Sequence, residues 1–279
     1  MHVPPDLLEI TEALLPGVPL GDATLSEHGR IHHVVLLPGK AAVRIARRSD
    51  AAADLPRRTE LLKAIGRAGL PFAVPEPLTG VRWFGERAAV AHSWIPGSGH
   101  PEGTGDPARM ANVLSALREL PITTELRQAL ETRQHDADPR RWSDVLIQEV
   151  LPRLPERWRE DGRRRIEAAM ALEAVPYTLV HGDLGAGNIH WGDDGEVIGV
   201  LDWDFAQLFD PAYDAALMAW HGWDNLRQAV DAGTYRRARV WEDTFGAGHL
   251  AAVLNGRPLT CPTSFVTYLV PWLEEHKVS

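Results

Sequence analysis

The sequence predicts an α+β protein in two parts, a small β-rich lobe over residues 1–95 and a larger, mostly helical lobe over residues 96–279. Short apolar runs of strand length are concentrated before residue 95. Helical periodicity prevails beyond residue 106. A segment rich in Gly and Pro, residues 96–107, lies between the two patterns. We therefore expect this segment to link the lobes.

The N-terminal lobe is expected to contain two helices and two pairs of strands. Pro38 and Gly39 form a tight turn between two apolar runs. Pro56 suits the first turn of a helix, in which Leu61, Leu62 and Ile65 form an apolar stripe. The expected elements are an amphipathic helix near the N-terminus, strands at 32–37 and 40–47, a helix from Pro56 to Arg67, and a hairpin from 81–85 and 87–95.

The C-terminal lobe is expected to be helical, with strands inserted in its middle. Asp106 and Pro107 are good N-cap and first-turn residues for a helix that reaches Leu120. Helical periodicity continues through 142–154 and 157–172. Strand-like pieces then follow, "TLVHGD", "NIHW" and "VIGVLDW", the last two joined by a turn at 192–196. Helices are expected to resume near Pro211 and to continue to the end.

Composition and charge exclude several classes of function. Of the 279 residues, 44% are hydrophobic and 24% are charged, and no apolar run approaches the roughly 20 residues that span a bilayer. The first residues lack the pattern of a signal peptide, and Cys261 is the single cysteine, so we expect no intramolecular disulfide and a cytoplasmic location. No basic stripe suggests nucleic-acid binding.

The acidic residues are concentrated in the second part of the chain. Residues 1–97 carry 11 Lys and Arg against 10 Asp and Glu, whereas residues 98–279 carry 18 against 28. This asymmetry has two interpretations: ordinary solubility, or a surface that attracts a cationic small molecule.

Three polar residues form the strongest chemical signal. Asp183 and Asn188 are five residues apart, and Asp202 follows at the end of the next strand pair. The turn between the strands brings their ends to one edge, so the three side chains are expected to surround one volume. Phosphoryl transfer needs this set: an Asp that orients the acceptor hydroxyl, with an Asn and a second Asp that hold Mg²⁺. The alternative is that Asp183 and Asn188 merely organise loops through hydrogen bonds to the backbone.

"HGDLGAGN" followed by "LDWD" resembles the core of the aminoglycoside phosphotransferase and choline kinase-like superfamily, whose fold is the bilobal protein-kinase-like fold. "VRIAR", "RRTELLKAIGRAGLPFAVPEPL", "AHSWIPGS" and "DPAYDAA" resemble further segments of that fold, in the same order. More closely, "GRIHHVVLL", "ARRSDAAADLPRR" and "HGDLGAGNIHW" are similar to the viomycin and capreomycin phosphotransferases, which act on cationic cyclic peptide antibiotics.

The resemblance implies a nucleotide-binding lobe over 1–95, hinge included, and a catalytic and acceptor-binding lobe over 96–279. Asp183 is then the base, and Asn188 and Asp202 hold Mg²⁺. ATP is the expected phosphoryl donor, with GTP possible. His181, before the base, is expected to tie loops together.

Further donor-site residues follow from the same resemblance, with two departures from the kinase pattern. The usual strand Lys is absent, so Arg44 is expected to grip the phosphates, with Arg47 as the alternative. Glu60 is the implied ion-pair partner of this cation. Only Gly29 marks the nucleotide loop, and adenine is expected at backbone groups of 92–94, including Ser93 and Trp94.

Three acidic residues are candidates for contacts with a cationic acceptor. Asp204 follows the metal-binding Asp, and it could instead contact a second metal or its water, or be a solvated side chain. Asp210 and Asp214 flank a helix start, where Asp210 is most simply an N-cap. The alternative substrates are an aminoglycoside, a macrolide or a small metabolite, and the alternative outside enzymes is a nucleotide-binding pseudokinase. No nucleic-acid or membrane partner is expected.

Overall fold

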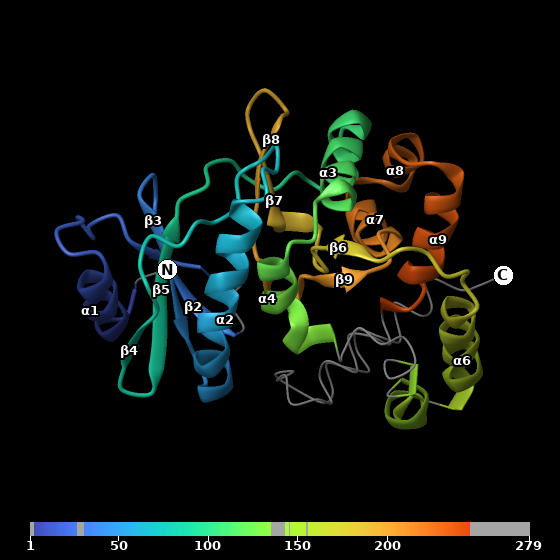
Figure 1. The fold of residues 1–279 in the computed structure, drawn as a ribbon, viewed down its shortest axis with the longest axis horizontal. Coiled ribbons are helices and arrows are strands. Elements are labelled where there is room, and N and C mark those ends of the chain that lie inside the picture. The colour runs from blue at the N-terminus through green and yellow to red at the C-terminus, as the bar shows by residue number, and fades with distance from the viewer. Residues whose placement is uncertain (1–2, 27–30, 135–142, 145, 155, 246–279) are drawn as a thin grey trace.

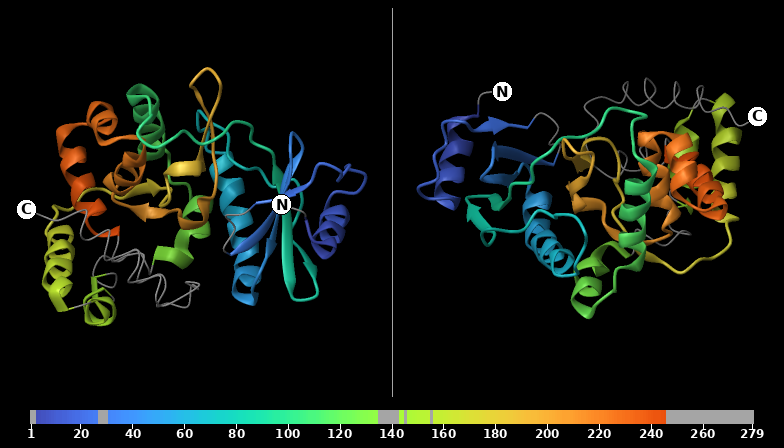
Figure 2. Two further views of the ribbon diagram at one scale, coloured as in Figure 1. Left: turned by 180° about the vertical axis from the view of Figure 1, so that it is seen from behind. Right: turned by 90° about the horizontal axis from the view of Figure 1, so that it is seen from above.

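The computed structural model describes residues 3–26, 31–134, 143–144, 146–154 and 156–245. A sheet with two helices lies at one end of the described chain, and helices gather at the other end (Figure 1). The views from behind and from above show the same separation (Figure 2). The expected order, a β-rich part followed by a helical part, is confirmed.

The N-terminal part is an antiparallel five-stranded sheet with the strand order β1-β2-β3-β5-β4. Its strands are β1 (Thr24–Leu25), β2 (His32–Leu37), β3 (Ala41–Ala46), β4 (Arg82–Phe84) and β5 (Arg87–Ser93). Its helices are α1 (Pro5–Leu14) and α2 (Ser49–Gly66).

The two helices cover opposite faces of the sheet because side chains alternate along a strand. Val43 and Ile45 of β3 pack in the cluster that contains α1. Ala46 of the same strand and Val90 of β5 pack in the cluster that contains the first half of α2. Arg44 has the same parity as Ala46 and pairs in register with Val90, so it lies on the α2 face.

Helix α2 begins earlier than the sequence predicted. It starts at Ser49, and Pro56 lies inside it rather than in its first turn. A proline within a helix removes one backbone hydrogen bond. Burial of Ala51, Ala52 and Leu55 against the sheet offsets that loss and extends the helix toward its N-terminus.

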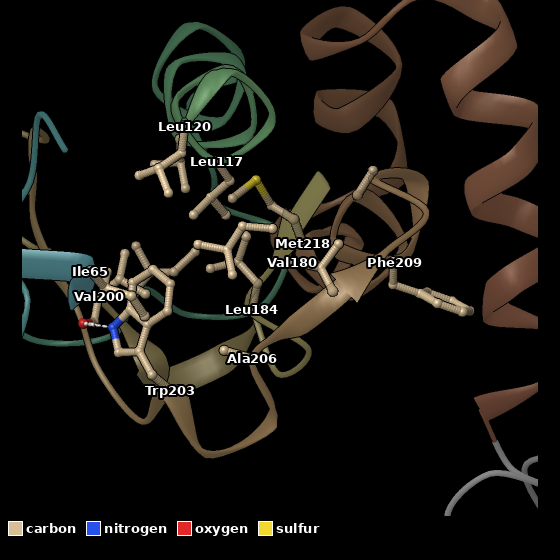
Figure 3. Packing of buried hydrophobic residues seen from close by; sticks show 14 of the residues in the cluster. Ile65, Leu117, Leu120, Val180, Leu184, Val200, Trp203, Ala206, Phe209 and Met218 are labelled. Carbon is tan, nitrogen blue, oxygen red and sulfur yellow. Dashed lines mark hydrogen bonds between the residues drawn. The ribbon is translucent and has the colours of Figure 1, made fainter. Parts of the chain in front are cut away.

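The helical part has one core that reaches back to the first lobe. Figure 3 shows Leu117, Val180, Trp203 and Met218 packed together, with Ile65 of α2 beside them. The helices are α3 (Pro107–Glu119), α4 (Thr124–Gln134), α6 (Glu156–Met170), α7 (Ala212–Met218), α8 (Trp223–Ala229) and α9 (Ala232–Glu242).

Most expected elements of this part are found, and some lie outside the described residues. Asp106 caps α3 by accepting a hydrogen bond from the Arg109 N–H at 2.9 Å, as expected. The predicted helix at 142–154 is only partly described, as the short turns Leu146–Val150 and Leu151–Arg153. The helix predicted to continue to the end falls on 246–279, outside the described residues. Among the helices of the described ranges, none is both long and apolar enough to cross a membrane.

Two strand pairs bring the motif residues together. Strand β6 (Thr178–Val180) pairs with β9 (Gln207–Phe209), and β7 (Ile189–Trp191) pairs with β8 (Val197–Val200). The loop from β6 to β7 and the loop from β8 to β9 therefore both connect the same two strand pairs. They lie side by side, with Asp183 and Asn188 on the first loop and Asp202 on the second.

Candidate active site

His181 fixes the loop that carries Asp183. Its Nε2 donates to the Leu201 carbonyl at 2.7 Å, and its Nδ1 accepts from the Asp183 N–H at 3.2 Å. The side chain is fully buried, and this burial lowers its pKa to about 4, so the ring is neutral in the tautomer that these bonds require. The expected structural role of His181 is supported by both contacts.

Asp214 fixes the backbone of the same loop. Its carboxylate accepts from the backbone N–H groups of His181 at 2.6 Å and Gly182 at 2.9 Å. Burial raises the pKa of Asp214 to about 7, although the two N–H donors favour the ionised form. Gly182 has φ of +80° and touches Phe205 so closely that a Cβ would clash with the Phe205 carbonyl. This is a turn that only glycine fits.

Asp183 and Asn188 contact each other directly. The Asn188 Nδ2 donates to the backbone carbonyl of Asp183 at 2.8 Å and to its Oδ2 at 3.0 Å. Both side chains are half-buried. The amide is thereby oriented with its nitrogen toward Asp183, which leaves its oxygen as an available metal ligand.

Asp202 presents its carboxylate from a strained backbone. With φ 54° and ψ 64°, it is the one non-glycine residue of the described chain in the left-handed region. Its side chain keeps 45% of its surface exposed. Desolvation by the surrounding protein and repulsion from Asp204 and Asp183 nevertheless raise its pKa to about 6, against the attraction of Arg44. Non-glycine residues in this conformation concentrate at functional sites.

The donor set suits Mg²⁺. The Asn188 and Asp202 side chains offer oxygen atoms, and Asp183 and Asp204 add negative charge nearby. Within the described ranges, no group of three or more His, Cys, Asp or Glu forms a metal cage. A site built from one Asn and one Asp relies on water and substrate phosphates for its remaining ligands, which is how Mg²⁺ is usually bound.

Arg44 points into this region from β3. Its Nη1 donates to Asp204 Oδ1 at 3.1 Å and its Nη2 to Asp204 Oδ2 at 2.6 Å, while its Nη2 also lies 3.0 Å from His32 Nδ1. The same Nη2 is 3.6 Å from Asp202 Oδ1. Burial opposes the positive charge, but the two carboxylates outweigh it and raise the pKa of Arg44. Arg44 rather than Arg47 therefore faces the candidate site.

Glu60 does not pair with Arg44, contrary to the sequence prediction. It lies on the outer side of α2 with 66% of its side chain exposed, and its Oε1 accepts from Lys63 at 2.7 Å. Residues two apart on a helix point in nearly opposite directions. Arg58 of the same helix therefore faces inward and contacts Asp204.

The three predicted acceptor contacts are all buried structural residues. Asp204 is 7% exposed and is paired with Arg44 and Arg58, so its expected contact with a metal, a water or the acceptor is replaced by an ion pair. Asp210 accepts from the Ala212 N–H at 2.9 Å, as an N-cap would, and also pairs with Arg237. Asp214 supports the loop as described above.

The other predicted nucleotide contacts are only partly placed. Ser93 ends β5, and its N–H donates to the Glu76 carbonyl at 2.8 Å while its hydroxyl accepts from the Glu76 N–H at 2.9 Å. The Ser93 N–H is therefore not available to adenine. Trp94 follows it and is half-buried at the start of the link to the helical part. Gly29 lies outside the described residues.

Comparison with known proteins places this geometry in a family. Residues 24–249 match the model of the phosphotransferase enzyme family. The chain is also 32% identical over 263 residues to viomycin phosphotransferase from Streptomyces vinaceus, with 88% of this chain and 87% of that protein covered.

Solved structures agree on the fold. The GDP complex of aminoglycoside 2'-phosphotransferase-IIIa superposes with a TM-score of 0.79 at 17% identity, covering 97% of both chains. Macrolide 2'-phosphotransferase type I superposes with a TM-score of 0.72 at 19% identity, covering 97% of this chain and 98% of that one. The kinase-like α+β fold predicted from the sequence is thus confirmed. Asp183, Asn188 and Asp202 lie within the matched range, and the chain belongs to the phosphotransferase enzyme family.

Proposed function

We propose that the protein transfers the γ-phosphoryl group of ATP to a hydroxyl of a cationic cyclic peptide antibiotic of the viomycin and capreomycin type. The observation that carries this proposal is the likeness to viomycin phosphotransferase over 88% of the chain. The excess of acidic residues after position 98 supports a cationic acceptor. Modification of an antibiotic in the cytoplasm, where ATP is available, would confer resistance.

In the proposed reaction, Asp183 orients the acceptor hydroxyl and takes its proton. The hydroxyl oxygen forms a bond to the γ-phosphorus as the bond to the β,γ-bridging oxygen breaks, and the nucleoside diphosphate leaves. Asn188 and Asp202 would hold Mg²⁺, which supplies charge neutralisation for the donor phosphates. Arg44 adds a fixed positive charge at the same place, and positioning and electrostatics provide most of the catalysis.

The contacts to adenine and acceptor are less defined. Because the N–H of Ser93 is engaged, we assign adenine recognition to the backbone from Trp94 onward. The division into a donor lobe at 1–95 and an acceptor lobe at 96–279 agrees with the link that begins there. The acceptor is expected to meet Asp183 from the helical side, through residues other than the three buried aspartates.

A phosphorylation panel tests the proposal. The protein, Mg²⁺ and ATP or GTP are incubated separately with viomycin, capreomycin, an aminoglycoside and a macrolide, and product masses are recorded. Addition of one phosphoryl group to the cyclic peptides alone would support the proposal. Product only on an aminoglycoside or a macrolide would contradict the acceptor class. No product with nucleotide binding intact would favour a metabolite kinase or a pseudokinase.

A further inference from the structure

A buried cluster of charges joins three elements beside the candidate phosphate site. It consists of Arg44 on β3, Arg58 on α2 and Asp204 in the short turn Trp203–Phe205. All three side chains have exposed fractions of 15% or less. We propose that Asp204 and Arg58 are the positioning residues that hold Arg44 against the donor phosphates, so that α2 acts on the phosphate site through a cation rather than a carboxylate. This inference rests on the proposed role of Arg44.

Asp204 fixes the orientation of Arg44. Each carboxylate oxygen accepts from a different terminal nitrogen of the guanidinium, at 3.1 and 2.6 Å. Such a two-point contact holds the plane of the guanidinium, which a single contact does not. His32 adds a third contact at 3.0 Å, and its ring is neutral because burial and the nearby Arg44 lower its pKa to about 3.

Arg58 explains why Asp204 can stay buried and ionised. Its Nη1 contacts the Asp204 carboxylate, so this carboxylate has two cations as partners. With only 7% of its side chain exposed, the Asp204 carboxylate depends on such charged partners in place of water. The carboxylate is therefore shared between Arg44 on β3 and Arg58 on α2.

Arg58 is itself held in place by α2. Its Nε donates to Asp54 Oδ2 at 2.7 Å, one helical turn earlier. Arg57 bonds to the same carboxylate at 2.7 and 2.9 Å, but its other bond goes to the Ala129 carbonyl and not to Asp204. The two neighbouring arginines therefore share one anchor and differ in whether they reach the cluster.

The cluster also adjoins the candidate metal ligand. Asp204 lies two residues after Asp202, whose strained backbone begins the same turn, and Arg44 lies 3.6 Å from Asp202. Arg58 and Asp204 therefore connect α2 to the Asp202 turn by direct contacts. Glu60, which is exposed and paired with Lys63, takes no part.

The neighbouring arginines provide a matched test. We compare Arg58→Gln with Arg57→Gln by titrating ADP with Mg²⁺ in a calorimeter and by measuring steady-state kcat and KM. Loss of a charge-assisted contact in Arg58→Gln should weaken ADP binding and lower kcat/KM for ATP roughly tenfold. The KM for the acceptor at saturating ATP should stay unchanged, and Arg58→Lys should recover part of the loss. Arg57→Gln should remain within about twofold of the parent.

A double-mutant cycle distinguishes positioning from a general structural role. Asp204→Asn should weaken ADP binding in the parent, but on an Arg44→Gln background it should cost no more than about twofold, because its effect acts through Arg44. Full additivity would overturn the proposal. So would equal losses in Arg57→Gln and Arg58→Gln, or a loss in Glu60→Gln with none in Arg58→Gln. ADP binding needs no acceptor, so these outcomes are independent of the antibiotic assignment.

Discussion

Asp183 has one oxygen occupied by the Asn188 amide, and its carboxylate is the group that we assign to the acceptor proton. The supporting contacts reach it through the backbone: His181 accepts the Asp183 N–H, and Asp214 accepts the two N–H groups before it. These backbone contacts do not depend on the carboxylate of Asp183.

Asp183→Asn should lower the turnover rate strongly while nucleotide binding is kept. The amide oxygen can still accept from Asn188, but the side chain no longer takes a proton, so kcat should fall roughly a hundredfold to ten-thousandfold. Rates of phosphoryl transfer and ADP calorimetry measure the two effects. Asp193→Asn, in the exposed turn of the β7/β8 hairpin, is the control and should behave as the parent. Substantial activity in Asp183→Asn would remove Asp183 as the base.

Gly182→Ala should cause a larger loss of activity and stability than the strain of a positive φ angle alone would cause. Gly182 and Gly195 have similar φ angles, +80° and +77°, so alanine costs about 1 kcal/mol of backbone strain at each. At Gly195 the new Cβ meets open space, whereas at Gly182 it meets the Phe205 carbonyl. Urea unfolding and activity should therefore show a small loss for Gly195→Ala and a large one for Gly182→Ala. Equal losses would contradict the close approach.

At the scale of elements, helix α2 shows what the sequence could predict. The spacing of Leu61, Leu62 and Ile65 correctly predicted the buried stripe of the helix. The same spacing extended backward reaches Arg58, three and four residues before the two leucines, and not Glu60. The signal for Arg58 was therefore present in the sequence. The family resemblance instead implied the carboxylate of Glu60.

Residues of the loops were predictable in part. Asp183, Asn188 and Asp202 were identified because a motif with fixed spacing lies between strands that pair. The roles of Asp204 and Asp214, and the pairing of Asp210 with Arg237, were not, because their partners Arg58, the loop N–H groups and Arg237 are distant in sequence. The pairing of β6 with β9 could not be predicted either. The two strands are distant in sequence, and each has only three residues.

Asp210→Ala should destabilise the fold without changing acceptor recognition. Its carboxylate pairs with Arg237 and accepts from the Trp241 Nε1 at 2.7 Å, which ties α9 to the start of α7. Removing one partner of a buried ion pair costs about 3–5 kcal/mol of unfolding free energy. Asp231→Ala, which removes the exposed N-cap of α9, should cost about 1 kcal/mol. A raised acceptor KM with unchanged stability would restore Asp210 to the acceptor site.

At the scale of the molecule, the β7/β8 hairpin joins the two lobes. The Ala73 N–H, beyond α2, donates to the Ile198 carbonyl at 2.8 Å, and Ser98 of the link exchanges backbone hydrogen bonds with Trp191. Gly199 permits this approach, because a Cβ there would lie 2.9 Å from the Ala73 carbonyl. The hairpin therefore carries the predicted catalytic loop on one side and the connection between lobes on the other.

Buried histidines occur in both lobes and determine how stability depends on pH. His32, His92, His181 and His221 are each at most 3% exposed. Burial is the main cause that lowers their pKa values, to about 3 for the first two and about 4 for the others. The unfolded chain therefore binds more protons than the folded one between about pH 6.5 and pH 4, and stability should fall as pH falls through this window.

Two carboxyl groups oppose this trend. Desolvation and repulsion from Asp204 raise the pKa of Asp202 to about 6, and burial raises that of Asp214 to about 7, so each stabilises the fold as pH falls toward the ordinary value of 3.8. Asp202 keeps 45% of its side chain exposed, so its share is the smaller one. Four imidazoles against two carboxyls leave a net loss. Each unbalanced proton contributes about 1.4 kcal/mol per pH unit, so the unfolding free energy should decrease as the pH falls below 6.

A single substitution checks the origin of this loss. Neither ring nitrogen of His221 has a partner among the described residues, so phenylalanine can replace the ring without breaking a hydrogen bond. In urea unfolding between pH 7.5 and pH 5, His221→Phe should show a shallower loss of stability than the parent, by about 1 kcal/mol per pH unit. An unchanged slope in His221→Phe would show that His221 does not cause the loss, which leaves the other buried imidazoles, His32, His92 and His181, as the groups to examine next.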